Sequence, residues 1–191
     1  MINNIHLIIQ ARLSSERMPA KILAPWGSSS ILIEHIMDEC RKVRAEHYTI
    51  ATDHDSEWGL REYAHWPYKL YPGSTDDVLG RFIGASSPDD EWIMRVCADS
   101  PFISAALMNH LINEAGEDAD IVNMMDIPDG MCGELVKRSA LVRLYATATD
   151  EEKEHVTLGV YDDDRARWEC VDPPKLSIDT EEEYTYLRSL I

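Results

Sequence analysis

Short apolar runs alternate along this chain with segments whose apolar residues recur at helical spacing, and this alternation restricts the fold most strongly. Residues 5–10 form an almost continuous apolar run, typical of a strand buried on both faces. Further strands are predicted over 47–52, 68–71, 92–97, 121–123 and 176–178. Helices are predicted over 32–43, 53–65, 74–84, 103–112, 138–148 and 180–191. This order predicts a mainly parallel sheet covered on both faces, in which ligands bind beyond the carboxyl ends of the strands.

Length, charge and cysteine count narrow the class of protein. The 191 residues suffice for one domain over 1–191 with a two- or three-layer core. Asp and Glu number 35 against 18 Lys and Arg, and the net charge of −17 excludes nucleic-acid binding through a general phosphate-neutralising surface. The sequence has no signal peptide and no apolar run of about 20 residues, so we expect a cytoplasmic protein without a membrane partner. The 4 cysteines form no C-x-x-C motif and are too few for a disulfide scaffold.

The stretch from Gln10 to Lys21 follows the first predicted strand and lies in a part of the chain that reverses the acidic balance. Residues 1–45 hold 6 basic and 4 acidic side chains. Two guanidiniums, one ammonium and two hydroxyls in this stretch are suited to polyphosphate oxygens, and a structureless loop of this length is usually functional. It lacks the glycines of a P-loop or a dinucleotide-binding turn. The alternative is a solvated surface loop whose cations only provide solubility.

This stretch carries the pattern Q-A-R-x-x-S-x-R-x-P-x-K, which resembles the signature of nucleotidyltransferases that activate acidic sugars with CTP. The nearest type is the cytidylyltransferase of the spore-coat polysaccharide biosynthesis protein F type, akin to the Kdo and acylneuraminate cytidylyltransferases. The resemblance continues in order through 32–36, 51–53, 77–82, 95–103, 154–157 and 177–180. It implies a Rossmann-like, three-layer α/β/α fold of the nucleotide-diphospho-sugar transferase type, with a mainly parallel, mixed sheet.

The resemblance also implies a nucleotide site along the first loop. Arg12 and Lys21 would hold the triphosphate, with Arg17 as a helper. The full set of implied nucleotide-binding residues is Gln10, Ala11, Arg12, Arg17, Lys21, Thr52, Asp53, Arg81 and Arg95. One departure is Ala20, which stands beside the lysine where the family usually has Gly and which could stiffen the loop.

Arg81 and Arg95 also have readings that need no ligand. Arg81 fits a solvated position on the helix over 74–84 equally well. Arg95 lies within an apolar strand, where an unpaired cation is costly, and a structural partner such as Asp53 would satisfy it equally well. Two readings therefore stay open for each arginine.

Asp99 and Asp179 each stand where a predicted strand gives way to a helix. Nucleotidyl transfer needs Mg²⁺ to offset charge on the phosphates, and Mg²⁺ commonly takes only one or two protein carboxylates. The resemblance gives Asp99 and Asp179 this metal-binding role. The alternative for each is an ordinary acid at a helix N-terminus, stabilised by the helix dipole.

The segment over 129–134 follows the strand over 121–123, and the resemblance places it near the acceptor. Glu134 is then a candidate for binding the acceptor, as are Glu154 and His155 in the matched Glu-His-Val-Thr motif. His155 could orient the acceptor's carboxylate or help to remove its hydroxyl proton, because imidazole titrates near neutral pH. We expect surface or packing roles for the other histidines.

As a whole, the resemblance implies an enzyme that joins CTP to an acidic sugar, giving a CMP-sugar and pyrophosphate for surface polysaccharide or glycan biosynthesis. Its implied catalytic set is Arg12, Lys21, Asp99 and Asp179. Its implied partners are CTP, a small acidic acceptor and Mg²⁺, and because similar enzymes are often homodimers, a homodimer stays open. Two alternatives remain: a nucleotide-binding protein of the same fold without transferase activity, and a nucleotidyltransferase acting on a non-sugar acid such as a phosphonate.

Overall fold

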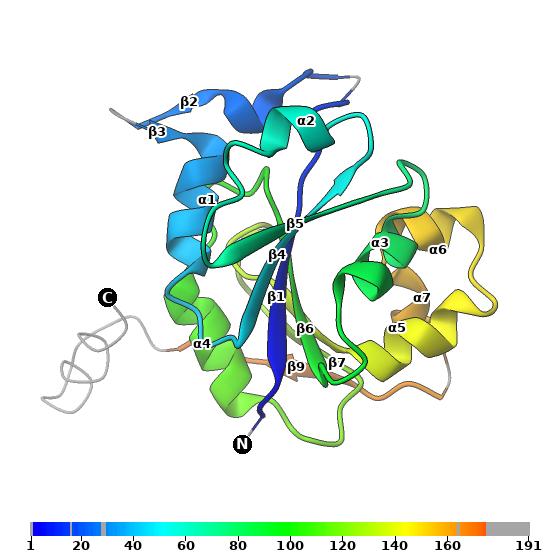
Figure 1. The fold of residues 1–191 in the computed structure, drawn as a ribbon. Coiled ribbons are helices and arrows are strands. Elements are labelled where there is room, and N and C mark those ends of the chain that lie inside the picture. Colours follow the sequence, from blue (N-terminus) through cyan, green and yellow to red (C-terminus); the bar gives the residue numbers. More distant parts are fainter. Residues whose placement is uncertain (1, 16, 28–29, 164, 175–191) are drawn as a thin grey trace, which may run out of the picture.

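The computed structural model describes residues 2–15, 17–27, 30–163 and 165–174, and its centre is a mixed seven-stranded sheet (Figure 1). The strand order is β5-β4-β1-β6-β8-β7-β9. The strands are β1 (Ile5–Gln10), β4 (His47–Asp53), β5 (Tyr68–Gly73), β6 (Trp92–Cys97), β7 (Ile121–Met124), β8 (Glu134–Lys137) and β9 (Trp168–Val171). Strand β8 runs antiparallel to β6 and β7, and the other neighbouring pairs are parallel. The predicted mainly parallel, mixed sheet is confirmed.

Helices cover both faces of the sheet. One face carries α1 (Leu32–Cys40) and α4 (Ala105–Glu114), and the other carries α3 (Val78–Ala85), α5 (Arg138–Tyr145), α6 (Asp150–His155) and α7 (Leu158–Tyr161) (Figure 1). Successive side chains of a strand point to opposite faces. Leu7 and Ile9 of β1 therefore share a buried cluster with α1, whereas Ile8 shares one with α3. The result is the predicted three-layer α/β/α arrangement.

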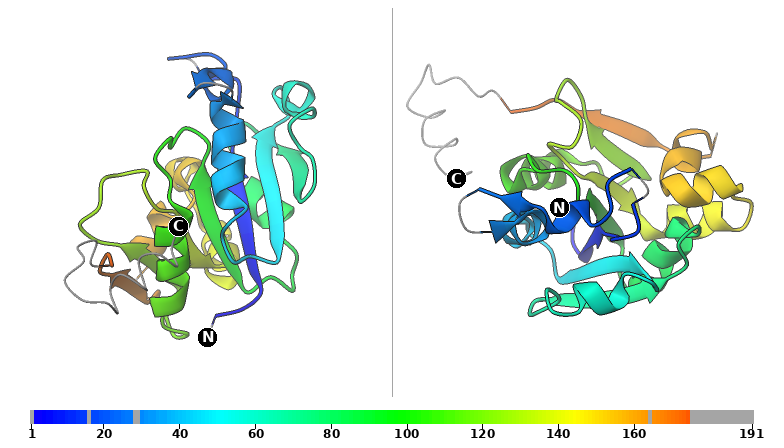
Figure 2. Two further views of the ribbon diagram at one scale, coloured as in Figure 1. Left: turned by 90° about the vertical axis from the view of Figure 1, so that its left-hand side faces the viewer. Right: turned by 90° about the horizontal axis from the view of Figure 1, so that it is seen from above.

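Short elements gather near the ends of the central strands. A 3-10 turn (Lys21–Leu23) leads into a small antiparallel ribbon of β2 (Pro25–Trp26) and β3 (Ser30–Ile31), and α2 (Glu57–Leu60) follows β4. Figure 2 (right) looks down on this end of the sheet, with the blue segment after β1 lying across it. None of the helices in the described ranges has the length and apolar character that crossing a membrane requires.

Two strands of the central sheet, β8 and β9, were not predicted from the sequence, nor was the short β2–β3 ribbon. Strands β8 and β9 each have only four residues, and both mix apolar with charged side chains, as in Glu-Leu-Val-Lys for β8. Apolar runs of this length are too short to be told from loops by periodicity. The strand predicted over 176–178 and the helix predicted over 180–191 lie outside the described residues.

Two predicted helices also differ from the structure. Only α2 forms within 53–65, and the rest of that range is turns and extended chain. The helix predicted over 74–84 starts later than expected, because α3 begins at Val78 with Asp77 as its N-cap. Asp77 Oδ1 accepts a hydrogen bond from the N–H of Gly80 at 2.8 Å.

Candidate active site

A cavity of about 720 Å³ opens at the edge of the sheet where β1, β4 and β6 end, here called the carboxyl edge. Its walls come from the loop after β1, the turn before α3, the end of β6 and the end of α6. The predicted site residues that line it are Gln10, Ala11, Arg12, Arg17, Lys21, Arg95, Asp99, Glu154 and His155. Segments far apart in the sequence thus meet around one polar space.

The loop after β1 is anchored to β4 before its cations begin to line the cavity. The N–H of Ala11 donates to the carbonyl oxygen of Ala51 at 3.0 Å. Farther along, Ser14 Oγ donates to Asp53 Oδ2 at 2.7 Å. These bonds position a loop that has no regular secondary structure of its own.

Asp53 and Thr52 lie beneath this loop and do not line the cavity. Both are fully buried, and Asp53 also accepts a hydrogen bond from the N–H of Ser56 at 2.7 Å. Burial alone would raise the pKa of Asp53, but its hydrogen bonds from Ser14 and Ser56 outweigh burial and lower the pKa. Asp53 supports the loop through Ser14, and direct contact of either residue with a nucleotide stays a prediction.

Ala20 and Lys21 form the turn that aims the ammonium group into the cavity. Ala20 has a φ of 54° and a ψ of 27°, in the left-handed region that favours glycine. Lys21 Nζ donates to Asp99 Oδ2, and the two side chains are 32% and 44% exposed. Because both are so open to solvent, this pair contributes little to stability and is free to exchange partners.

Asp99 is not a helix-capping acid. The following helix, α4, begins at Ala105, and its N-cap is Ser104, whose Oγ accepts from the N–H of Leu107 at 3.4 Å. The capping alternative is therefore wrong for Asp99, whose carboxylate faces the cavity instead. Asp179 lies outside the described residues, as does the matched segment over 177–180.

Arg81 is buried within the protein and is not a solvated helix residue. It is 2% exposed, and its three guanidinium nitrogens have no hydrogen-bond partner among the described residues. Burial lowers the pKa of Arg81, and the nearby Asp53 carboxylate opposes that change. The solvated reading is wrong, and a nucleotide contact stays a prediction because Arg81 does not line the cavity.

Arg95 pairs with Glu134 and not with Asp53. Arg95 Nη1 donates to Glu134 Oε2 at 2.5 Å and to Thr157 Oγ1 at 3.3 Å, while its buried Nε has no partner in the described ranges. Glu134 Oε1 also accepts from the hydroxyl of Tyr161 at 2.9 Å. Glu134 therefore holds Arg95 in place, and it is itself held by two hydroxyl groups.

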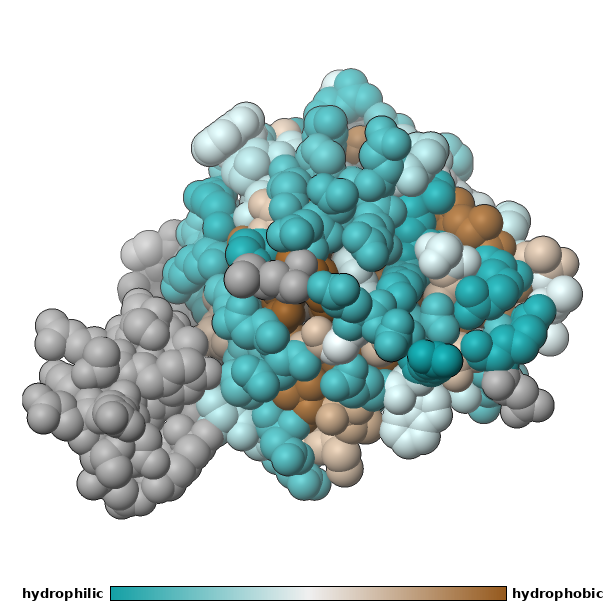
Figure 3. Space-filling view, turned by 90° about the horizontal axis from the view of Figure 1, so that it is seen from below, coloured by the Kyte–Doolittle hydropathy of each residue, from teal (hydrophilic) through white to brown (hydrophobic). Residues whose placement is uncertain are grey.

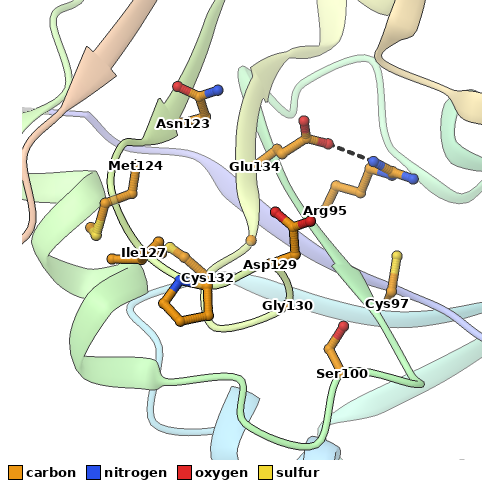
Figure 4. Close-up of a pocket in the computed structure, with 12 residues that line it drawn as sticks. Arg95, Cys97, Ser100, Asn123, Met124, Ile127, Asp129, Gly130, Cys132 and Glu134 are labelled. Carbon is orange, nitrogen blue, oxygen red and sulfur yellow. Dashed lines mark hydrogen bonds and ion pairs between the residues drawn. The ribbon is translucent and has the colours of Figure 1, made fainter.

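A second, smaller cavity of about 280 Å³ adjoins the first and shares Arg95 and Cys97 with it (Figure 4). Its polar lining includes Ser100, Asn123 and Asp129, together with the Arg95–Glu134 pair drawn as a dashed line in Figure 4. It also contains two cysteine thiols, at positions 97 and 132. Burial raises the pKa of both thiols, to about 12 for Cys132, so they are neutral at pH 7.

The predicted acceptor residues divide between the two cavities. Glu134 lines the smaller one, whereas Glu154 and His155 lie exposed at the end of α6 and line the larger one. Val156, directly after His155, is fully buried with a φ of 58°, which is strained for a β-branched residue. Strained backbone conformations cluster at functional sites, and here both Ala20 and Val156 adjoin a cavity-lining side chain.

Several polar residues that the sequence did not single out also line the two cavities or support them. The larger cavity adds Ser14, Ser15, Thr75 and Asp76, and the smaller one adds Ser100, Asn123 and Asp129. Thr157 and Tyr161 hold Glu134 from behind. Of these, Ser15, Ser100 and Thr157 stand within the matched motifs and Asp129 within the segment over 129–134, whereas the others depend on the folded arrangement.

Comparisons with known proteins agree with this arrangement. The family model described as Cytidylyltransferase matches residues 6–186 of this chain. Spore coat polysaccharide biosynthesis protein SpsF of Bacillus subtilis is 27% identical over 208 aligned residues, which cover 99% of this chain and 87% of that protein. A cytidylyltransferase structure from Leptospira borgpetersenii has a TM-score of 0.82 at 20% identity, covering 98% of this chain and 86% of that chain.

Two further neighbours were solved with ligands. CMP:2-keto-3-deoxy-manno-octonic acid synthetase, in complex with CTP, has a TM-score of 0.64 at 15% identity, with 97% of each chain covered. Rv0371c of Mycobacterium tuberculosis, in complex with manganese, has a TM-score of 0.64 at 16% identity, covering 98% of this chain and 99% of that chain. At these identities, the likeness concerns the fold alone.

Proposed function

This chain belongs to the cytidylyltransferase family and is a CTP-dependent nucleotidyltransferase, and we propose that its acceptor is a small acidic sugar. The reaction would release pyrophosphate and give a CMP-sugar for surface polysaccharide or glycan synthesis. The observation that carries this proposal is the position of Arg95, which lines both cavities at the carboxyl edge. The larger cavity offers the cations that a triphosphate needs, and the smaller one offers the hydroxyl and amide groups that a sugar needs.

The triphosphate of CTP would lie against the loop after β1. Arg12 and Arg17 present guanidinium groups that can bind phosphate oxygens in pairs, and Lys21 presents a mobile point charge. In the structure Lys21 pairs with Asp99 across the cavity. A triphosphate would compete with Asp99 for this ammonium group, so binding of CTP would release the Asp99 carboxylate.

The released carboxylate fits a hard divalent cation. Mg²⁺ prefers oxygen ligands and commonly uses one or two carboxylates together with phosphate oxygens and water. Asp99 supplies such an oxygen at the cavity wall, Asp179 is the second predicted ligand, and Asp76 also lines the cavity. When bound, Mg²⁺ would offset the negative charge of the phosphates and of the leaving pyrophosphate.

The chemistry requires an acceptor hydroxyl to attack the α-phosphorus as the bond to pyrophosphate breaks. Arg12 and Lys21 would neutralise charge on the departing oxygens, and most of the acceleration would come from charge neutralisation and positioning. Arg95 is rigid at the meeting point of the cavities because Glu134 fixes it. His155 is the candidate for taking the hydroxyl proton, since its imidazole lines the larger cavity.

One observation favours a second candidate, a neutral acceptor. Asp129 and Glu134 place two carboxylates on the smaller cavity against the single guanidinium of Arg95, which Glu134 already pairs. This charge balance would repel an acid that entered the smaller cavity. A neutral sugar or other polyol would meet hydroxyl, amide and carboxylate partners there without that cost.

A pyrophosphate-release screen separates these candidates. CTP, UTP, ATP and GTP are each combined with acidic sugars, their neutral alcohols and hydroxyl-bearing phosphonates, in the presence of Mg²⁺. We expect release with CTP and an acidic sugar only. Release with the neutral partner of a matched pair would favour the second candidate. Binding of CTP–Mg²⁺ without release from any acceptor would favour a nucleotide-binding protein without transferase activity.

A further inference from the structure

Three metal-ligating side chains converge at the opposite end of the central strands, here called the amino edge. His6 lies near the start of β1, His47 begins β4, and Asp90 lies in the turn before β6. Asp90 Oδ2 is 2.7 Å from His6 Nδ1, and Asp90 Oδ1 is 3.0 Å from His47 Nδ1. The ligand atoms of the three residues all lie within 4.8 Å of one another. Sequence analysis expected only surface or packing roles for these histidines.

We propose that His6, His47 and Asp90 form a binding site for Zn²⁺ or a similar divalent cation, separate from the active site. Two imidazole nitrogens and one carboxylate oxygen are the ligand set that Zn²⁺ binds well, whereas Mg²⁺ prefers oxygen ligands alone. Three protein ligands leave a fourth position for water. The site would therefore select a different class of cation from the one expected at Asp99.

The ligand atoms lie near enough to one another to gather around one cation. With zinc–ligand bonds of about 2.0–2.1 Å, neighbouring ligand atoms stand about 3.3 Å apart. The contacts to Asp90, at 2.7 Å to Oδ2 and 3.0 Å to Oδ1, are shorter than this spacing, and the ligand atoms lie at most 4.8 Å apart, so binding requires small shifts of the three side chains. The metal would bind the Nδ1 lone pair of each neutral imidazole, and the single ring proton would then sit on Nε2, which in His6 faces Thr49 Oγ1. A cation can reach the proposed site from solvent through His47, because the His47 side chain is 53% exposed.

Hydrogen bonds behind the three ligands suit metal binding as well. His6 Nε2 lies 2.8 Å from Thr49 Oγ1, and Asp90 Oδ2 accepts from the N–H of Ser87 at 2.7 Å. A hydroxyl group can donate or accept, so Thr49 satisfies Nε2 whether or not His6 Nδ1 carries a proton. Outer partners of this kind orient the ligands of metal sites.

The backbone around the cluster is rigid, and the surface around it is open. His6 and His47 are direct partners in the parallel ladder of β1 and β4, so their spacing is set by the sheet. The described surface at this end of the molecule is mostly hydrophilic, with small separate apolar patches (Figure 3). The ammonium of Lys69, on β5, faces the same region and would weaken cation binding, but it is exposed and therefore screened by solvent. A bound cation would tie β1, β4 and the turn before β6 together.

Calorimetric titration of the full chain with Zn²⁺ tests the proposal. The titration is run in an Asp99→Asn background, which removes the described carboxylate expected to bind a cation in the active-site cavity. We expect one Zn²⁺ per chain with micromolar affinity, a rise in thermal unfolding temperature with Zn²⁺, and at least tenfold weaker binding in His47→Gln. Because His47 is exposed, the glutamine variant should fold, which circular dichroism would check.

The matched control is His54→Gln. His54 is also exposed and directly follows the same strand, β4, but at the carboxyl edge. The His54→Gln substitution should leave the Zn²⁺ affinity unchanged. In nitrogen-15 spectra, the imidazole Nδ1 signals of His6 and His47 should move when Zn²⁺ is added. Equal affinities for the His47→Gln and His54→Gln variants, or shifts at His155 alone, would overturn the proposal. None of these measurements depends on transferase turnover.

Discussion

The carboxyl edge and the amino edge of one sheet hold buried polar groups in contrasting ways. At the amino edge, His6 and Asp90 are each 5% exposed, and both are fully engaged with each other, with Thr49 and with Ser87. Near the carboxyl edge, buried side-chain atoms lack hydrogen-bond partners among the described residues. They belong to Gln10, Thr52, Arg81 and Arg95. Because unsatisfied buried groups cost stability, their concentration at one edge indicates that this edge is organised for a ligand.

Backbone strain follows the same division. Ala20 and Val156 have positive φ values next to Lys21 and His155, which line the larger cavity. The amino edge also has a residue with positive φ, Asn4, but asparagine adopts this conformation at little cost. The active-site edge thus carries strain and unpaired groups, whereas the opposite edge is relaxed. Variants at the two edges should therefore separate activity from stability.

The largest expected effect is the loss of turnover in Asp99→Asn. The amide keeps the shape of the side chain but removes the charge proposed to hold Mg²⁺, so pyrophosphate release should fall by at least about 100-fold. The free energy of unfolding should hardly change, because Asp99 is half exposed and caps no helix.

Raised Mg²⁺ or Mn²⁺ should partly restore the Asp99→Asn activity. If both residues hold one metal, the rate of pyrophosphate release in the Asp99→Asn, Asp179→Asn double variant should fall by far less than the product of the two single-variant decreases. A near-normal rate of the Asp99→Asn variant at limiting Mg²⁺ would contradict the metal role and remove the main functional contrast between the edges.

A smaller effect is expected for Lys21→Ala, which should weaken binding of CTP more than binding of CMP. The ammonium is expected to contact the oxygens that leave as pyrophosphate, and CMP lacks them. We expect about a tenfold or greater loss for CTP, because hydrogen bonds to charged groups are worth about 1.5–3 kcal/mol. Calorimetry with both nucleotides measures the difference, and equal losses would contradict this position for Lys21.

Sequence patterns predict the central fold because its strands are long and apolar. The run that forms β1 buries all but one of its residues and the run that forms β6 buries four of six, so the residue types alone indicate strands. β8 could not be predicted, since it is set by antiparallel pairing with β6 and β7 across the sheet. Secondary structure that depends on distant partners leaves little local signal.

The same limit applies to the site. The matched motif indicated Arg12 and Lys21, because both cations belong to one continuous segment of the chain. The pairing of Arg95 with Glu134 joins residues 39 positions apart, and His6 and Asp90 are 84 positions apart. Spatial neighbours of this kind follow only from strand order, which the sequence did not specify in detail.

At the amino edge, we expect stability to depend on pH in the range where His6 titrates. Burial lowers the pKa of His6 below its ordinary value of 6.5, and the charges of His47 and Lys69 act in the same direction against the opposing Asp90. The unfolded chain therefore takes up a proton before the folded one does. The free energy of unfolding should be highest above pH 6.5 and should fall as the pH drops below it.

The His6→Gln variant should flatten this pH dependence. Loss of one titrating group can change the slope by at most about 1.4 kcal/mol per pH unit. Urea unfolding between pH 7.5 and pH 5 measures the slope, and His54→Gln is the control with an exposed imidazole. An unchanged slope in His6→Gln would mean that the acid sensitivity arises outside the amino edge.

The smallest expected effect comes from Ala20→Gly, and it tests whether strain at the carboxyl edge serves binding. Glycine adopts the φ of 54° freely, so the free energy of unfolding should rise by about 0.5–1 kcal/mol. Val156→Gly should do the opposite, since Val156 is fully buried and its lost apolar contacts exceed any relief of strain. If the strained alanine holds Lys21 toward the triphosphate, the Ala20→Gly variant should also bind CTP more weakly despite being more stable. A gain in stability with unchanged CTP affinity would mean that the strain at this turn has no part in binding.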